Sequence, residues 1–398
     1  MLVTALVTPF VGGGDALDIE RLRELVGFQL ECGADLVLLA GTTGEGGLLS
    51  PDERTRVLDA ALEVARPSRL MWALGTGRVA DVIASGRVAL ERGVRDLLLV
   101  DAPYSGASSG ALRTGWHGAV ASALPDARLY PYAVPGRTGT EMLPDDLARL
   151  AHDHANVVGV KDATGRLARM LRVRELCGPD FKLLCGDDHL MRDALVDPAI
   201  RADGVVSFVA NLVPDVVARL VAAGLAGDAV AARREHERLE LLTPLVSVTV
   251  EESLELGERH LSVPQRSRNP VPVKQALAVL GVIDGAVRAP LAAMGPHGTA
   301  RVRNMLRMAG RRHSDLFDAA ERLLGANVDR SRVLCVGDGV VTDVLGAANQ
   351  KLDCLFIARG IHGDAARGPD GRIDPARAGD LLKAESTFAR YAALDLAW

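Results

Sequence analysis

The chain has 398 residues, of which 48% are hydrophobic and 24% charged, and its formal net charge is −5. These proportions are typical of a globular protein, and the acidic balance provides no basic surface for nucleic acid. No uninterrupted apolar run reaches the roughly 20 residues of a membrane span, and no basic segment precedes an apolar stretch at the N-terminus. The five cysteines are scattered, which favours a reducing compartment. We therefore expect a cytoplasmic protein that binds neither nucleic acid nor membrane.

Short apolar runs alternate with helical patterns over the first half of the chain. Helical spacing of apolar residues recurs between the runs, as in Ile19–Leu30, Asp52–Val64 and Leu143–Ala151. A strand followed by a helix, repeated eight times, predicts an α/β fold of the (β/α)8 TIM-barrel type, with a doubly wound open sheet as the alternative. The eight runs are Leu2–Val7, Leu36–Ala40, Leu70–Leu74, Leu97–Val100, Arg128–Val134, Val157–Val160, Lys182–Leu184 and Val205–Val209.

Further helical patterns follow the eighth run. They cover Asp215–Leu225 and Ala229–Leu242, and a third begins in Asn269-Pro270-Val271-Pro272-Val273-Lys274 and reaches Leu280. We interpret these as extra C-terminal helices of the barrel, which places a first domain at residues 1–295.

Residues with chemical potential fall directly after the predicted strands. Gly41-Thr42-Thr43-Gly44-Glu45 follows the second run, Tyr132 and Pro135–Gly139 close the fifth, and Gly186-Asp187-Asp188 follows the seventh. Lys161 closes the sixth run. Because catalytic groups of such barrels lie at the C-terminal ends of the strands, we expect these residues to share one site.

Lys161 is the strongest candidate in this group. It ends the apolar run Val157–Val160 and precedes the turn-like sequence Asp162-Ala163-Thr164-Gly165. A lysine with a buried stem and an amine at a strand mouth is suited to attack a carbonyl and form a Schiff base. The alternative is a lysine at a strand end that merely reaches water.

The other rim residues suit a small carboxylate substrate. Thr42 and Thr43 offer hydroxyl and backbone N–H groups on a tight turn, and Arg137 could clamp a second carboxylate. Tyr132 could transfer a proton near the lysine, with Thr42 as a relay. Each also has an ordinary structural interpretation: a simple turn, a core aromatic residue and a solvated loop arginine.

Residues 1 to about 290 resemble the dihydrodipicolinate synthase / N-acetylneuraminate lyase family of Schiff-base-forming lyases. Six segments in family order carry the resemblance: Thr4-Ala5…Thr8-Pro9-Phe10, Gly41-Thr42-Thr43-Gly44-Glu45, Tyr132-Ala133-Val134-Pro135-Gly136-Arg137-Thr138-Gly139, Gly159-Val160-Lys161-Asp162-Ala163-Thr164-Gly165, Gly186-Asp187-Asp188 and Asn269-Pro270-Val271-Pro272-Val273-Lys274.

The resemblance implies a mechanism and a set of roles. Lys161 would form an imine with pyruvate, Tyr132 and Thr42 would carry protons, and the resulting enamine would attack an aldehyde. Thr43 and Val206 would contact substrate, and Arg137 would bind the carboxylate of aspartate semialdehyde. The implied activity is that of a 4-hydroxy-tetrahydrodipicolinate synthase of lysine biosynthesis, without a cofactor, in a homo-oligomer (dimer or tetramer).

One residue departs from the family pattern. Ser105 stands where that branch usually has a second tyrosine, which enters the site of a neighbouring subunit and completes a proton relay. This departure leaves two alternatives open: a sibling 2-oxo-acid aldolase or dehydratase, and a catalytically weak barrel that serves as a scaffold.

Residues 296–398 form a second segment with its own pattern. Predicted strands cover Arg332–Gly337 and Cys354–Ala358, and Asp338 and Asp343 are a candidate Mg²⁺ site or, alternatively, a capped turn. Residues 301–398 resemble the C-terminal part of haloacid dehalogenase-like hydrolases. The nucleophilic Asp-x-Asp of that family is absent, so we expect a partial Rossmann-like α/β tail with a vestigial metal site and no phosphatase activity.

Overall fold

The computed structural model describes residues 1–257, 259–312, 322, 334–337, 340, 344–349, 351–358, 363–384 and 387–394. The chain forms two compact units, Met1–Val302 and Arg303–Trp398. The boundary falls within helix α13 (Pro296–Arg312), whereas the sequence pattern suggested residue 295. Among the described helices, none combines the length and apolarity needed to span a bilayer.

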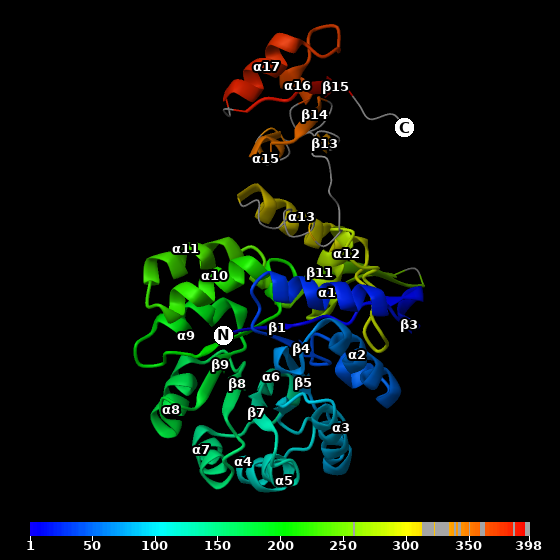
Figure 1. The fold of residues 1–398 in the computed structure, drawn as a ribbon. Helices are drawn as coiled ribbons and strands as arrows, with labels where there is room; N and C mark the ends of the chain where they lie inside the picture. Colours follow the sequence, from blue (N-terminus) through cyan, green and yellow to red (C-terminus); the bar gives the residue numbers. More distant parts are fainter. Residues whose placement is uncertain are drawn as a thin grey trace. The chain divides into compact units, whose positions relative to one another are not determined.

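The first unit is a closed barrel of eight parallel strands surrounded by helices (Figure 1). Strands β1 and β4 pair with each other and close the sheet, so the open-sheet alternative is excluded. Two short strands, β2 (Phe10–Val11) and β3 (Ala16–Leu17), pair outside the barrel. The barrel strands are β1 (Leu2–Ala5), β4 (Leu36–Leu39), β5 (Leu70–Ala73), β6 (Asp96–Val100), β7 (Arg128–Ala133), β8 (Gly159–Asp162), β9 (Lys182–Cys185) and β10 (Gly204–Ser207).

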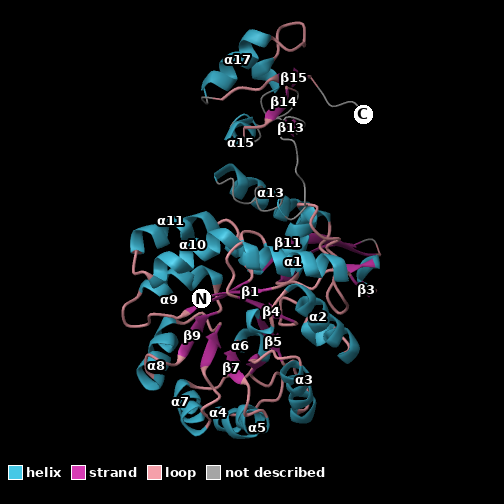
Figure 2. Cartoon of the chain, viewed as in Figure 1, coloured by secondary structure: helices cyan, strands magenta, loops and turns pink. Residues whose placement is uncertain are grey.

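The near-continuous hydrophobicity of the strands reflects burial on both faces. On β5, Met71 and Ala73 belong to the cluster of side chains that fills the barrel. Trp72 alternates with them, and its indole Nε1 donates to Ser85 Oγ on α3 (Val79–Glu91) at 3.1 Å. Each strand therefore packs on the barrel core with one face and on the helical layer with the other (Figure 2).

The helices that the sequence predicts begin and end within a few residues of the expected positions. Helix α2 starts at Pro51, where Ser50 and Glu53 form a reciprocal capping box. Helix α2 ends at Val64. The other helices of the first unit, besides α3 and α13, are α1 (Ile19–Glu31), α4 (Ser109–Ala111), α5 (Ala119–Ala123), α6 (Pro135–Thr138), α7 (Pro144–Asp153), α8 (Leu167–Cys177), α9 (Met191–Val196), α10 (Pro214–Leu225), α11 (Ala229–Leu239) and α12 (Val271–Val279).

A long β-hairpin lies between α11 and α12 and was not predicted. Strands β11 (Ser247–Leu256) and β12 (Arg259–Arg268) pair in antiparallel register from Ser247↔Arg268 to Leu256↔Arg259. The base of the hairpin is anchored, because Val248 is buried and the Asn269 N–H donates to the Val246 carbonyl at 2.9 Å. The alternating sequence of residues 248–256 is the signal that reveals a strand.

A buried ion pair joins α12 to the turn after β4. Lys274 Nζ lies 2.6 Å from Glu45 Oε1, and both side chains are fully buried. Burial lowers the pKa of Lys274, and the neighbouring Glu45 carboxylate opposes that effect. The second oxygen, Glu45 Oε2, accepts from the Arg288 backbone N–H at 3.0 Å, so the carboxylate is bonded on both sides.

Replacing Lys274 with Met should strongly destabilise the barrel, because Glu45 would remain buried and unpaired. Breaking a buried pair by removing one partner typically costs about 3–5 kcal/mol. Urea unfolding of the two chains measures the difference, and the Glu45→Gln/Lys274→Met double variant should recover part of it. As a control, Arg78→Met removes the solvent-exposed pair with Asp81 and should change stability little. Equal effects of Lys274→Met and Arg78→Met would contradict this account.

The described part of the second unit contains a small parallel sheet of order β13-β14-β15. Its strands are β13 (Leu334–Gly337), β14 (Asp353–Ile357) and β15 (Tyr391–Ala393), and its helices are α15 (Leu345–Asn349), α16 (Gly363–Ala366) and α17 (Pro375–Ala384). Phe356 and Cys354 on β14 belong to its buried cluster. Parallel strands with intervening helices confirm a partial α/β tail of the predicted kind.

Candidate active site

Lys161 and Tyr132 are cross-strand neighbours at the C-terminal rim of the barrel. The sequence placed Lys161 after the sixth strand, but β8 begins only at Gly159, so Lys161 lies inside it and pairs with Tyr132 on β7. Lys161 Nζ lies 4.0 Å from the centre of the Tyr132 ring, and both side chains are 6% exposed. The amine is thus held against an aromatic face in a largely desolvated position.

The strand next to the lysine leaves room for it. A Cβ atom on Gly186 would lie 3.0 Å from Lys161 Cε and 2.9 Å from Ala163 Cβ, so a larger residue would displace the lysine stem. On the other side, the buried Asp162 carboxylate pairs with Arg169 and accepts from the Thr164 N–H at 3.0 Å. These contacts fix the end of β8 and the turn that follows it.

Thr42 and Thr43 lie on a tight turn directly after β4. The turn closes through the Gly46 N–H, which donates to the Gly41 carbonyl at 3.0 Å. A Cβ on Gly46 would lie only 1.7 Å from the Ala40 carbonyl oxygen, so this turn requires glycine there. Thr43 is buried, whereas Thr42 is exposed.

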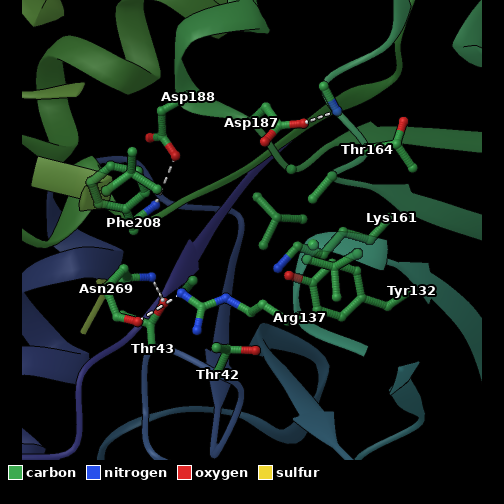
Figure 3. A pocket seen from close by; sticks show the side chains of 18 of the residues that line it. Thr42, Thr43, Tyr132, Arg137, Lys161, Thr164, Asp187, Asp188, Phe208 and Asn269 are labelled. Carbon is green, nitrogen blue, oxygen red and sulfur yellow. Dashed lines mark hydrogen bonds between the residues drawn. The ribbon is translucent and has the colours of Figure 1, made fainter. Parts of the chain in front are cut away.

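Asn269 connects this turn to the arginine on the opposite loop. Its side-chain Nδ2 donates to Thr43 Oγ1 at 2.9 Å, and its backbone carbonyl accepts from Arg137 Nη2 at 2.7 Å (Figure 3). The sequence marked the segment beginning at Asn269 as the start of a helix and as one of six family segments, but assigned Asn269 no role in the site. Because Asn269 and Thr43 are 226 positions apart, no local pattern could reveal this contact.

One cavity of about 270 Å³ collects the predicted site residues. Lys161, Tyr132, Thr42, Thr43, Arg137 and Val206 all line it. The Arg137 side chain is exposed, and partial desolvation by the surrounding protein lowers the pKa of its guanidinium. Lining residues that the sequence did not predict as site residues include Arg268, Asn269, Thr243, Val246 and Phe208.

Two acidic residues lie across the cavity from Arg137 (Figure 3). Asp187 Oδ2 accepts from the Gly165 N–H at 2.8 Å, and burial raises the pKa of this carboxyl. Asp188 is fully enclosed, where it accepts from Ser207 Oγ and from the Val209 N–H at 3.2 Å. Burial raises the pKa of Asp188 to about 6, against the opposing effect of these donors.

The raised pKa of Asp188 predicts a pH-dependent stability. The folded state holds this proton more tightly than the unfolded chain, so Asp188 lowers the free energy of unfolding as pH rises from 3.8 to about 6. Above that window its contribution is constant. Asp188→Asn removes the titration, so the stability difference between wild type and variant should fall over this window and then level off. Chemical unfolding at several pH values measures it, and a flat difference would refute the prediction.

The positions expected to complete a proton relay lie elsewhere. The Ser105 hydroxyl donates to the Ala102 carbonyl at 3.0 Å, and Tyr104 is fully exposed with a left-handed backbone (φ 60°). Neither Ser105 nor Tyr104 is among the residues that line the cavity around Lys161. In the described residues, no three histidine, cysteine, aspartate or glutamate side chains converge on a common metal position. The candidate metal residues Asp338 and Asp343 lie outside the described residues.

Comparison with known proteins gives two family matches. A model of the dihydrodipicolinate synthetase family matches residues 1–309, and a HAD-hydrolase-like model matches residues 305–382. The 4-hydroxy-tetrahydrodipicolinate synthase of Geobacter metallireducens is 36% identical over 297 residues, which cover 74% of this chain and 92% of the relative. That of Trichlorobacter lovleyi is 36% identical over 310 residues, covering 77% and 97%.

Solved structures agree with this result. Dihydrodipicolinate synthase from Aquifex aeolicus superimposes with a TM-score of 0.67 at 28% identity, covering 77% of this chain and 96% of that structure. The enzyme from Acinetobacter baumannii, solved in complex with pyruvate, gives a TM-score of 0.68 at 29% identity and covers 77% and 98%.

Proposed function

Because the chain belongs to the dihydrodipicolinate synthetase family, we propose that its barrel is a 4-hydroxy-tetrahydrodipicolinate synthase, a Schiff-base-forming lyase of lysine biosynthesis. It condenses pyruvate with aspartate semialdehyde and needs no metal or organic cofactor. The observation that carries the proposal is the cavity in which Lys161, Tyr132, both threonines and Arg137 converge.

Lys161 provides the covalent step. Its neutral amine attacks the ketone carbon of pyruvate, water leaves, and an imine links the lysine to the substrate. The methyl group of this imine loses a proton to give an enamine, whose terminal carbon attacks the aldehyde. The amine lies 4.0 Å from the centre of the Tyr132 ring, so the departing protons have a nearby phenol hydroxyl.

The cavity offers donors of two kinds for two different carboxylates. Thr42 and Thr43 provide hydroxyl and amide donors for the carboxylate of pyruvate, with Thr43 held in place by Asn269. Val206 forms part of the apolar wall near the methyl group. Arg137 on the other loop binds the carboxylate of the aldehyde, and Asp187 lies on the opposite wall, where it can receive its ammonium group.

The proton relay is shorter than in relatives with a second tyrosine. A small cavity of about 90 Å³ lies beside Thr42 and Tyr132, lined also by Thr76 and Val100. It is large enough for water, and we propose that water there takes the place of the absent tyrosine hydroxyl. Assembly into a dimer or tetramer, and a cytoplasmic location, stay predictions.

Trapping the imine tests the function directly. Incubation with pyruvate and borohydride should add a reduced three-carbon group to Lys161, and peptide mass spectrometry locates it. Lys161→Ala should abolish both the adduct and the formation of product from pyruvate and aspartate semialdehyde. An adduct that persists in Lys161→Ala, or never forms in the wild type, defeats the proposal. An adduct without turnover of aspartate semialdehyde would favour a sibling aldolase.

The tail should be dispensable for this chemistry, because the residues that line the cavity all precede residue 270. Deletion of residues 313–398, which leaves α13 intact, should preserve lyase turnover within a few-fold.

The full chain should release no phosphate from common phosphate esters with Mg²⁺, since its tail lacks a phospho-acceptor aspartate. Mg²⁺-dependent phosphate release that Asp338→Asn abolishes would contradict this expectation. A truncated chain that folds but has lost lyase turnover would contradict the expectation that the tail is dispensable.

A further inference from the structure

Two guanidinium groups border the lysine cavity, and neither has an acidic partner in the described residues. Arg137 and Arg268 both line this cavity, and both are accessible from solvent. Other arginines of the barrel form ion pairs: Arg169 pairs with Asp162, and Arg288 pairs with Glu53. For Arg137 and Arg268 the described contacts are with backbone carbonyl groups alone.

The two arginines brace each other's loops. Arg137 Nη2 donates to the Asn269 carbonyl at 2.7 Å, next to Arg268, while Arg268 Nη1 donates to the Gly136 carbonyl at 3.1 Å, next to Arg137. Each contact occupies one of the five N–H donors of a guanidinium, so donors remain on both groups. The positive charge of Arg268 also contributes to lowering the pKa of Arg137, after the larger effect of burial.

We propose that Arg268 is a second binding residue for the acid group of the aldehyde acceptor, acting together with Arg137. The inference rests on the proposed lyase function and adds a specificity-determining residue to it. Two like charges that face a common cavity repel each other until an anion lies between them. Thr42 and Thr43 offer neutral hydroxyl and amide donors, so the two guanidinium groups are left to bind a carboxylate-bearing acceptor.

The hairpin places Arg268 at this position. Arg268 is the last residue of β12 and pairs with Ser247, the first residue of β11, at the anchored base of the hairpin. Arg266 lies two residues earlier on the same strand, yet its Nε donates to Ser247 Oγ at 2.7 Å and it does not line the lysine cavity as described. The strand therefore offers a matched control for the loss of one positive charge.

Kinetics of Arg268→Gln, Arg268→Lys and Arg266→Gln test the inference in the full-length protein. Arg268→Gln should raise KM for aspartate semialdehyde about tenfold or more, as expected for loss of a charge-assisted contact. KM for pyruvate and the yield of the borohydride adduct should stay within about twofold. Arg268→Lys should be intermediate, because an ammonium group keeps the charge but not the planar fork. Arg266→Gln should resemble the wild type.

A binding measurement keeps the test independent of turnover. Succinate, a four-carbon dicarboxylate, should bind to the borohydride-reduced pyruvyl protein, and Arg268→Gln should weaken that binding about tenfold. Calorimetry measures both affinities. Equal affinities, an absence of succinate binding to the wild type, or a parallel rise of KM for both substrates would overturn the role of Arg268. A wild type that binds succinate but never converts aspartate semialdehyde would instead overturn the proposed function.

Discussion

The geometry of the rim depends on the buried ion pair between Lys274 and Glu45. Each charge is removed from water, so each requires the other, and together they fix the turn after β4 against the start of α12. The turn carries Thr43, and the segment before α12 carries Asn269, whose amide holds the Thr43 hydroxyl. A contact between residues far apart in sequence thus positions Thr43 on the wall of the cavity. An uncharged pair of similar shape would fill the same space without setting the same orientation.

Charge is unevenly distributed around the cavity, and in the proposed function this asymmetry distinguishes the two substrates. In that proposal the Lys161 amine becomes part of an imine, and Thr42 and Thr43 offer neutral hydroxyl and amide donors. Two guanidinium groups also line the cavity, and each donates to a backbone carbonyl beside the other arginine. In the proposed reaction, the first substrate is held chiefly by a covalent bond and hydrogen bonds. The second is held chiefly by charge.

The sequence predicted those parts of the site that local pattern encodes. Lys161 was recognisable because it ends an apolar run and precedes a turn. Its neighbour Tyr132 was recognisable because the parallel strands of a barrel end on one rim. The strand boundaries shifted by one or two residues, which placed Lys161 inside β8 instead of after it. The hairpin was not predicted, because Glu251-Glu252 interrupts the alternation of apolar and polar residues along β11. Arg268 and Asn269 reach the cavity through this hairpin and the tertiary fold, and neither contact leaves a periodic signal near its own position.

The position of Lys274 also constrains how the protein is made. All eight barrel strands have been synthesised once Ser207 leaves the ribosome, and the sheet could close at that point. Glu45 would then have no partner for its charge until the segment that contains Lys274 emerges. Translation at ~5–20 residues per second makes this interval several seconds long, which is ample time for strands to collapse. A nascent barrel must therefore stay open, or keep the β4 turn hydrated, until the chain beyond the hairpin arrives to neutralise it.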